Sequence, residues 1–160
     1  MKYLGIDYGE ERIGLAAGES NSGLAFALPT LQRKKYPGRE AFFVAILKII
    51  EQESIEAIVV GLPLPLTPLT TPVNSPLNLT QPELEPLSCR RARNFAASLK
   101  RRCALPIFLV NEALSSAEAE ERLKEAGLKG KKLLNALDSQ AAVIILETFF
   151  NLPVEQHNAI

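Results

Sequence analysis

Histidine, cysteine and tryptophan are scarce in this chain: its 160 residues include one histidine, two cysteines and no tryptophan. The histidine, His157, stands near the C-terminal end, so we expect neither a Cys/His zinc site nor a mechanism built on a buried histidine. Cys89 and Cys103 fall in a stretch that we predict as one helix, where fourteen residues span roughly 21 Å. A disulfide needs Cα atoms within about 7 Å, so these two cannot pair, and free thiols are typical of a reducing compartment.

Net charge and long apolar runs are also lacking. The 18 basic residues balance the 18 acidic ones, so nothing favours a generally basic protein that coats nucleic acid, and any basic surface has to be local. No apolar run approaches the ~18 residues that a membrane span needs. Asp7, Glu10 and Glu11 interrupt the N-terminal apolar stretch, so we expect no signal peptide. The expected location is the cytoplasm, with no membrane partner.

The segments with strand and helix patterns follow one another in the order βββαβαβαα. Two apolar, β-rich segments flank a Gly-Glu-Glu turn, which predicts a hairpin, and a third strand follows. This order predicts an α/β fold with a mixed five-stranded sheet, an antiparallel three-strand meander plus two parallel strands, and helices on both faces. We expect strands at 2–8, 12–18, 24–31, 55–62 and 106–110, and helices at 38–53, from about 90 to a point before Pro106, at 115–127 and at 138–150.

Residues 63–86 differ in composition from the rest, because they hold seven of the chain's 11 prolines. Proline removes backbone donors and blocks helices, so we predict an irregular loop here. The length of the chain suits one globular domain. We therefore expect a single domain over residues 1–150 that contains this Pro-rich loop, followed by a C-terminal tail over residues 151–160.

Three acidic residues stand where a carboxylate is well placed for chemistry. Asp7 lies inside the strand expected at the centre of the sheet, where a buried carboxylate needs a metal, a salt bridge (Arg12 is the alternative partner) or hydrogen bonds. Glu112 follows the strand at 106–110, at the end where ligands gather in open α/β sheets, unless it is a solvated loop acid. Asp138 begins the last predicted helix, where its alternative role is an N-cap. Together they predict a cluster of oxygen ligands for Mg²⁺ or Mn²⁺, and two such ions can hold a scissile phosphate and activate water.

Basic residues gather on the helix after the Pro-rich loop and on a later connector. Charges on a helix face are usually only solvated, but beside a phosphodiester site they bind a nucleic-acid backbone. We therefore consider six residues as candidates for nucleic-acid binding: Arg12, Arg90, Arg91, Arg93, Lys131 and Lys132.

Four motifs follow one another along the chain: Gly5-Ile-Asp-Tyr-Gly-Glu-Glu-Arg-Ile-Gly-Leu-Ala, Val59-Val-Gly-Leu-Pro-Leu, Asn111-Glu-Ala-Leu-Ser-Ser and Asp138-Ser-Gln-Ala-Ala-Val-Ile-Ile-Leu-Glu. In this order they resemble the YqgF family, the RuvX-like Holliday-junction resolvases that are also described as pre-16S rRNA nucleases. The resemblance covers most of the chain and implies an RNase H-like fold and metal-dependent phosphodiester cleavage. It also implies a role in trimming the 5′ end of the 16S rRNA precursor in the cytoplasm, with pre-rRNA and ribosomal particles as partners. By resemblance, Asp7, Glu112 and Asp138 match the family's acidic positions.

The chain departs from the family pattern in two places. Asn111 and Ala113 replace an acidic and a basic residue, and residues 63–86 form an insertion where the family has a short link. Two alternatives therefore stay open: cleavage of branched DNA such as a Holliday junction, and nucleic-acid binding in ribosome assembly without strong catalysis. The Gly-Ile-Asp-x-Gly motif also opens sugar kinases and actin-like ATPases, but these need two such lobes and 160 residues supply one.

Overall fold

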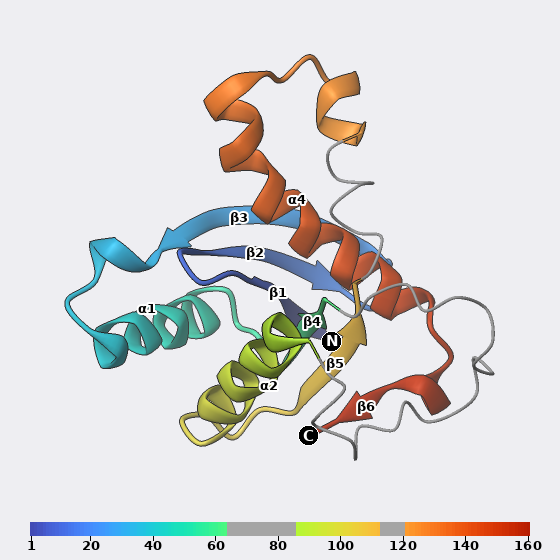
Figure 1. Cartoon of the computed structure of the whole chain (residues 1–160). Helices are drawn as coiled ribbons and strands as arrows, with labels where there is room; N and C mark the ends of the chain where they lie inside the picture. Colours follow the sequence, from blue (N-terminus) through green and yellow to red (C-terminus); the bar gives the residue numbers. More distant parts are fainter. Residues whose placement is uncertain (64–85, 113–120) are drawn as a thin grey trace.

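The computed structural model describes residues 1–63, 86–112 and 121–160 (Figure 1). The side chains of residues 131, 132, 134, 135 and 138 also lie outside this description. Most of the Pro-rich loop and the first half of the helix predicted at 115–127 therefore lie outside the described residues, while residues 121–125 are helical. Within the described residues, no helix combines the length and the apolar character that crossing a membrane requires.

A mixed sheet with the strand order β3-β2-β1-β4-β5-β6 forms the centre of the molecule. The strands β1 (Lys2–Tyr8), β2 (Arg12–Glu19) and β3 (Leu24–Gln32) make the predicted antiparallel meander. β4 (Ala57–Leu62) pairs with β1 and β5 (Ile107–Asn111) pairs with β4, both in parallel. The predicted fold class is confirmed.

The prediction of five strands is wrong, because β6 (Asn158–Ala159) adds a sixth, antiparallel to β5. His157 anchors this end of the chain: its ring stacks on Phe149 with the centroids 4.0 Å apart. A two-residue strand has no periodicity to read in a sequence, so residues 151–160 carried no strand signal.

Helices cover both faces of the sheet, as predicted (Figure 1). α1 (Arg39–Gln52) and α2 (Leu87–Lys100) pack on one face, and α4 (Gly130–Asn151) crosses the other. The 3₁₀ turns η1 (Arg33–Lys35) and η2 (Val154–Gln156) connect elements.

Two helix boundaries differ from those predicted. α4 begins at Gly130, eight residues before Asp138, so the N-cap role considered for Asp138 is wrong. The residues between them include leucine, lysine and alanine, which are strong helix formers, and no proline. α2 ends at Lys100, so Cys103 lies beyond the helix, and both cysteines are free thiols as expected.

Successive side chains of β1 point alternately toward the two layers of helices that cover the sheet. Leu4 and Ile6 belong to the core beneath α1 and α2, whereas Tyr3 packs in the core beneath α4. Gly5 lies on the α4 side, and a Cβ there would be 2.6 Å from Leu146 Cγ and 2.8 Å from the carbonyl oxygen of Ala142. Alternation therefore directs Asp7 toward the α4 side and Tyr8 toward the α1 and α2 side.

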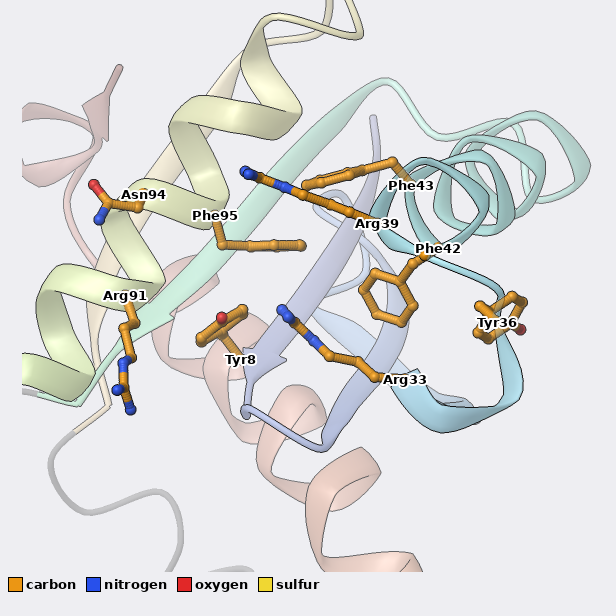
Figure 2. Close-up of a pocket in the computed structure, with 10 residues that line it drawn as sticks. Tyr8, Arg33, Tyr36, Arg39, Phe42, Phe43, Arg91, Asn94 and Phe95 are labelled. Atoms are coloured by element: carbon orange, nitrogen blue, oxygen red, sulfur yellow. The ribbon is translucent and has the colours of Figure 1, made fainter.

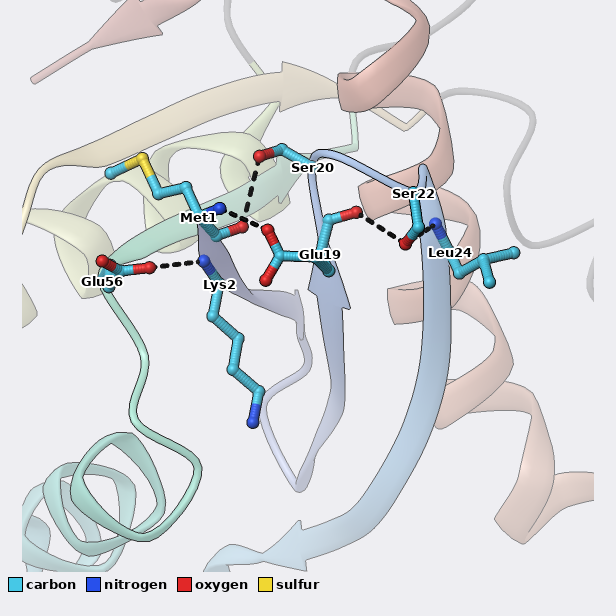
Figure 3. A network of polar contacts seen from close by, with 7 residues as sticks. All are labelled: Met1, Lys2, Glu19, Ser20, Ser22, Leu24 and Glu56. Atoms are coloured by element: carbon cyan, nitrogen blue, oxygen red, sulfur yellow. Dashed lines mark hydrogen bonds and ion pairs between the residues drawn. The ribbon is translucent and has the colours of Figure 1, made fainter.

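Polar contacts hold the amino end of β1, which is the opposite end of the strand from Asp7 and Tyr8 (Figure 3). The amino group of Met1 forms an ion pair with Glu19 of β2. The backbone N–H of Lys2 donates to Glu56 Oε2 at 2.8 Å, and the Ser20 hydroxyl donates to the Met1 carbonyl at 3.2 Å. These contacts tie β1 to both neighbouring strands and help fix its register.

The close approach of α4 to β1 predicts that Gly5→Ala destabilises the protein by about 1–3 kcal/mol, because the added methyl group overlaps Leu146 and a backbone carbonyl. Urea unfolding measures this loss. The double variant Gly5→Ala/Leu146→Ala should lose less stability than the sum of the two single variants, since the shorter side chain makes room. Strict additivity would contradict the contact.

Candidate active site

Two of the three predicted acids, Asp7 and Glu112, meet at the carboxyl end of the sheet. Asp7 is the penultimate residue of β1, and Glu112 directly follows β5. Their carboxyl groups are hydrogen bonded to each other. Burial, the charge of Asp7 and this hydrogen bond together raise the pKa of Glu112 to about 9. At neutral pH, without a cation, Glu112 is therefore protonated and its hydroxyl donates to the Asp7 carboxylate.

β4 lies between β1 and β5, and its residue Gly61 makes the contact between Asp7 and Glu112 possible. β1 and β5 are both parallel neighbours of β4, so their carboxyl ends lie at the same edge. A Cβ on Gly61 would lie 2.4 Å from Glu112 Oε2 and 2.5 Å from Ile145 Cδ1. A side chain at this position would thus displace Glu112, so the glycine provides the space over β4 in which Glu112 reaches Asp7.

The backbone fixes Glu112 in place as well. Its N–H donates to the carbonyl oxygen of Leu62 at 3.0 Å, which continues the parallel pairing of β4 and β5 by one residue. The Oε2 atom of Glu112 is buried and makes no hydrogen bond to the described residues, although the carboxyl group as a whole is bonded to Asp7.

Asp138, the third predicted acid, is the ninth residue of α4 and lies before the segment that packs on β1. It precedes Ala142 by four residues, which is about one helical turn, and the Ala142 carbonyl is the group that approaches Gly5. The Asp138 side chain is outside the description. Among the described side chains, no group of three or more histidines, cysteines and carboxylates forms a candidate metal site.

Asn111, which departs from the family pattern, occupies a different position from Glu112. It is the last residue of β5, it is exposed, and strand alternation places it on the opposite side of the sheet. Ala113 lies outside the described residues. The substitution at 111 therefore leaves the contact between Asp7 and Glu112 intact.

The candidate nucleic-acid-binding residues divide between two regions. Arg12 begins β2 and is half-buried, and the three arginines of α2 lie in its first two turns. Arg90 and Arg91 are exposed, and Arg91 forms an ion pair with Glu10 of the β1–β2 turn. These four arginines thus lie toward the end of the sheet that carries the acids. The side chains of Lys131 and Lys132, the last two candidates, are outside the description.

Sequence reasoning missed the part that Gly61 plays. Gly61 lies within β4, inside the strand predicted at 55–62, but its close approach to Glu112 was not predicted. A glycine inside an otherwise apolar strand is the available signal, because it marks a place where another group approaches the backbone closely.

The raised pKa of Glu112 predicts how the stability of the metal-free protein changes with pH. The folded chain keeps this proton up to about pH 9, whereas the usual value is 4.5. Between these values the folded chain binds more protons than the unfolded chain. The free energy of unfolding should therefore fall as pH rises, by up to about 1.4 kcal/mol per pH unit for one proton.

Urea unfolding in EDTA between about pH 5 and 9 checks this dependence. Glu112→Gln removes the titrating group and should flatten the profile. Glu121→Gln, at an exposed site, is the matched control and should leave the profile unchanged. Parallel profiles for the wild type and Glu112→Gln would show that Glu112 is ionised in the folded protein.

Comparison with known proteins shows which family this chain is similar to. The family model described as "RuvX: Holliday junction resolvase" matches residues 1–152. A protein of Maridesulfovibrio salexigens is 46% identical over 149 residues, which cover 93% of this chain and 97% of that protein. A protein of Nitratidesulfovibrio vulgaris (strain Miyazaki F) is 43% identical over 153 residues, which cover 96% of this chain and 95% of that protein. Both carry the name "Putative pre-16S rRNA nuclease".

The fold is similar to that of RuvC in a solved structure. The structure titled "T. thermophilus RuvC in complex with Holliday junction substrate" matches with a TM-score of 0.54 and 16% identity, covering 100% of this chain and 99% of that one. RuvC has an RNase H-like fold, so the fold expected from the resemblance is confirmed. The extent of the family match and the identity to these relatives show that the chain belongs to the RuvX family.

Proposed function

We propose that this protein is a metal-dependent nuclease that hydrolyses phosphodiester bonds, with its centre at Asp7 and Glu112 and with Asp138 as the third acid. The observation that carries the proposal is the contact between the two half-buried carboxyl groups, where desolvation, the charge of Asp7 and their hydrogen bond together raise the pKa of Glu112 to about 9. Desolvating an acid pair lowers the stability of the fold, so its presence points to a role other than stability. Perturbed carboxyl groups that share a site are typical of active centres.

The residues present fit a divalent cation. The described part of the site offers only oxygen atoms, which suit Mg²⁺ and Mn²⁺, and the buried Oε2 of Glu112 is one of them. The charge of Asp7 that holds the proton on Glu112 would instead attract a cation, and Glu112 would release its proton as it becomes a ligand. Bound ions of this class lower the pKa of water and stabilise a phosphate that is being cleaved.

The position of Asp138 supports its assignment as the third ligand. α4 brings this residue to one helical turn before the Ala142 carbonyl, which approaches Gly5 on the same strand as Asp7. The acids would act together: Asp7 from the central strand, Glu112 from the end of β5 and Asp138 from the covering helix.

The proposed substrate is the 5′ end of the 16S rRNA precursor, which the names of the full-length relatives support. Precursor ribosomal particles in the cytoplasm would then be the setting of the reaction. Branched DNA is the second candidate, because the family model carries the description of a Holliday junction resolvase. Arg12, Arg90, Arg91 and Arg93, with Lys131 and Lys132, would bind the phosphates of either substrate.

Metal-dependent cleavage is the expected outcome of an assay with a labelled 5′ precursor fragment and, in parallel, a four-way DNA junction. Cleavage should require Mg²⁺ or Mn²⁺ and stop with EDTA. Asp7→Asn should lower the rate by at least about 100-fold, because the amide keeps the shape but removes the charge.

Glu40→Gln is the matched control for this assay. Glu40 is an exposed acid of α1 that pairs with Arg102, away from the acid pair, so its removal should leave the rate unchanged. Undiminished cleavage by Asp7→Asn would place the active centre elsewhere. Binding without cleavage of either substrate would support the alternative of a nucleic-acid-binding protein without catalysis.

A further inference from the structure

A cavity of about 420 Å³ lies on the α1 and α2 side of the sheet, at the carboxyl end of β1. Its inner wall consists of aromatic rings that belong to the core: Phe42 and Phe43 of α1 and Phe95 of α2 are 3–4% exposed. Tyr8 of β1 packs against Phe95 with ring centroids 4.9 Å apart. Figure 2 shows these rings together with arginine side chains that reach into the same space. The volume is in the range of small-molecule sites.

Arg33 is the most informative residue of this cavity. Its guanidinium lies 5.1 Å from the ring centroid of Tyr8 and 5.1 Å from that of Phe42. Its Nε is buried and makes no hydrogen bond to the described residues. Guanidinium groups that are partly buried normally bind a carboxylate or phosphate, often through two hydrogen bonds. Here, within the described residues, two aromatic rings hold the group in place.

Two further arginines add positive charge to the lining of the cavity. Arg39 lies over Phe43 at 5.6 Å from the ring centroid, and its Nη2 donates to Ser98 Oγ at 2.5 Å. Arg91 lines the opposite side, where it pairs with Glu10. Among the described residues, those that line the cavity include no acidic side chain, although the whole chain has no net charge. The charge of this cavity is therefore a local feature.

Aromatic rings beside arginines are the chemistry that binds an unstacked nucleotide. Phe42, Phe43 and Phe95 are too buried to offer a ring face, so a base would stack on the half-buried Tyr8 or on the plane of the Arg33 guanidinium, and the arginines would bind its phosphate. An apolar ligand would leave the Arg33 guanidinium without an anion, and inorganic phosphate alone would leave the rings unused. We propose that this cavity binds one unpaired nucleotide of the substrate strand; the assignment to a strand rests on the nuclease function proposed above.

The position of the cavity relative to the acid pair agrees with this role. Tyr8, which lines the cavity, directly follows Asp7, and the Cα atoms of neighbouring residues are 3.8 Å apart. The two side chains point to opposite sides of the sheet, so the cavity and the acids share the carboxyl end of β1. A strand that crosses this end can place one phosphate at the acids and an adjacent unpaired nucleotide in the cavity. Such a subsite would favour substrates with an unpaired nucleotide near the cleaved bond.

Fluorescence anisotropy with a labelled single-stranded RNA of about ten nucleotides tests the proposal. EDTA is present throughout, so binding is measured without cleavage. Arg33→Met keeps an apolar side chain between the rings and removes the charged plane, and it should weaken RNA binding at least about tenfold. Lys34→Met makes the same change of charge at the exposed neighbouring residue outside the cavity and should change the affinity less than about threefold.

Arg33→Lys keeps the charge but loses the planar group, so it should also weaken binding, and it provides a second variant if Arg33→Met does not fold. Adenosine monophosphate should compete with the RNA on the wild-type protein, and adenosine and inorganic phosphate should each compete less well. One outcome would overturn the assignment to a strand and indicate a site for a free nucleotide. In that outcome adenosine monophosphate competes on the wild type but not on the Arg33 variants, while both variants bind RNA with unchanged affinity.

Equal losses for Arg33→Met and Lys34→Met would overturn the proposal, because Arg33 would then contribute only general charge. No loss for either variant would also overturn it, because the cavity would then contribute nothing to RNA binding. The outcome is independent of catalysis. RNA binding that depends on Arg33 in a protein that cleaves nothing would support the subsite and reject the nuclease function. Metal-dependent cleavage with RNA affinity unaffected at Arg33 would reject the subsite alone.

Discussion

The contact between the carboxyl groups of Asp7 and Glu112 is the constraint on which the rest of this structure depends. Bringing two acids together under a layer of apolar helix is unfavourable, and the protein accommodates it by keeping a proton on Glu112, whose pKa rises to about 9. The strand order β1-β4-β5 sets the two acids at one edge. Gly61 gives Glu112 room above β4, and Gly5 lets α4 approach β1. Both glycines thus serve the same site.

The carboxyl end of β1 contributes one residue to the acid pair and the next residue to the aromatic cavity, on opposite sides of the strand. Asp7 belongs to the acidic side under α4, and Tyr8 belongs to the aromatic and basic cavity between α1 and α2. Because alternate residues of a strand point to opposite faces, two neighbouring residues can serve cleavage and recognition separately. The polar contacts of Met1, Glu19 and Glu56 hold the other end of β1, so the strand is fixed along its length.

The sequence was sufficient to predict the meander and the two parallel strands, because apolar runs are local signals. It singled out Asp7 and Glu112 as candidates, because a carboxylate within or directly after a strand is also a local signal. The first turns of α4 were missed because its apolar face becomes continuous only after Asp138, while propensity extends the helix back to Gly130. β6 is too short to give a pattern. The role of Gly61 and the cavity around Arg33 depend on segments that are distant in the sequence, and only the fold brings them together.

Anomalous diffraction from crystals soaked in Mn²⁺ tests most directly whether the acid pair is a metal centre. Density is expected beside the carboxylates of Asp7 and Glu112, with oxygen ligands at about 2.0–2.6 Å and the Asp138 carboxylate completing the site. The same crystals of Asp7→Asn should show weaker density or none. Full occupancy elsewhere on the protein, with Asp7 and Glu112 still hydrogen bonded to each other, would contradict the assignment of this pair as the catalytic centre.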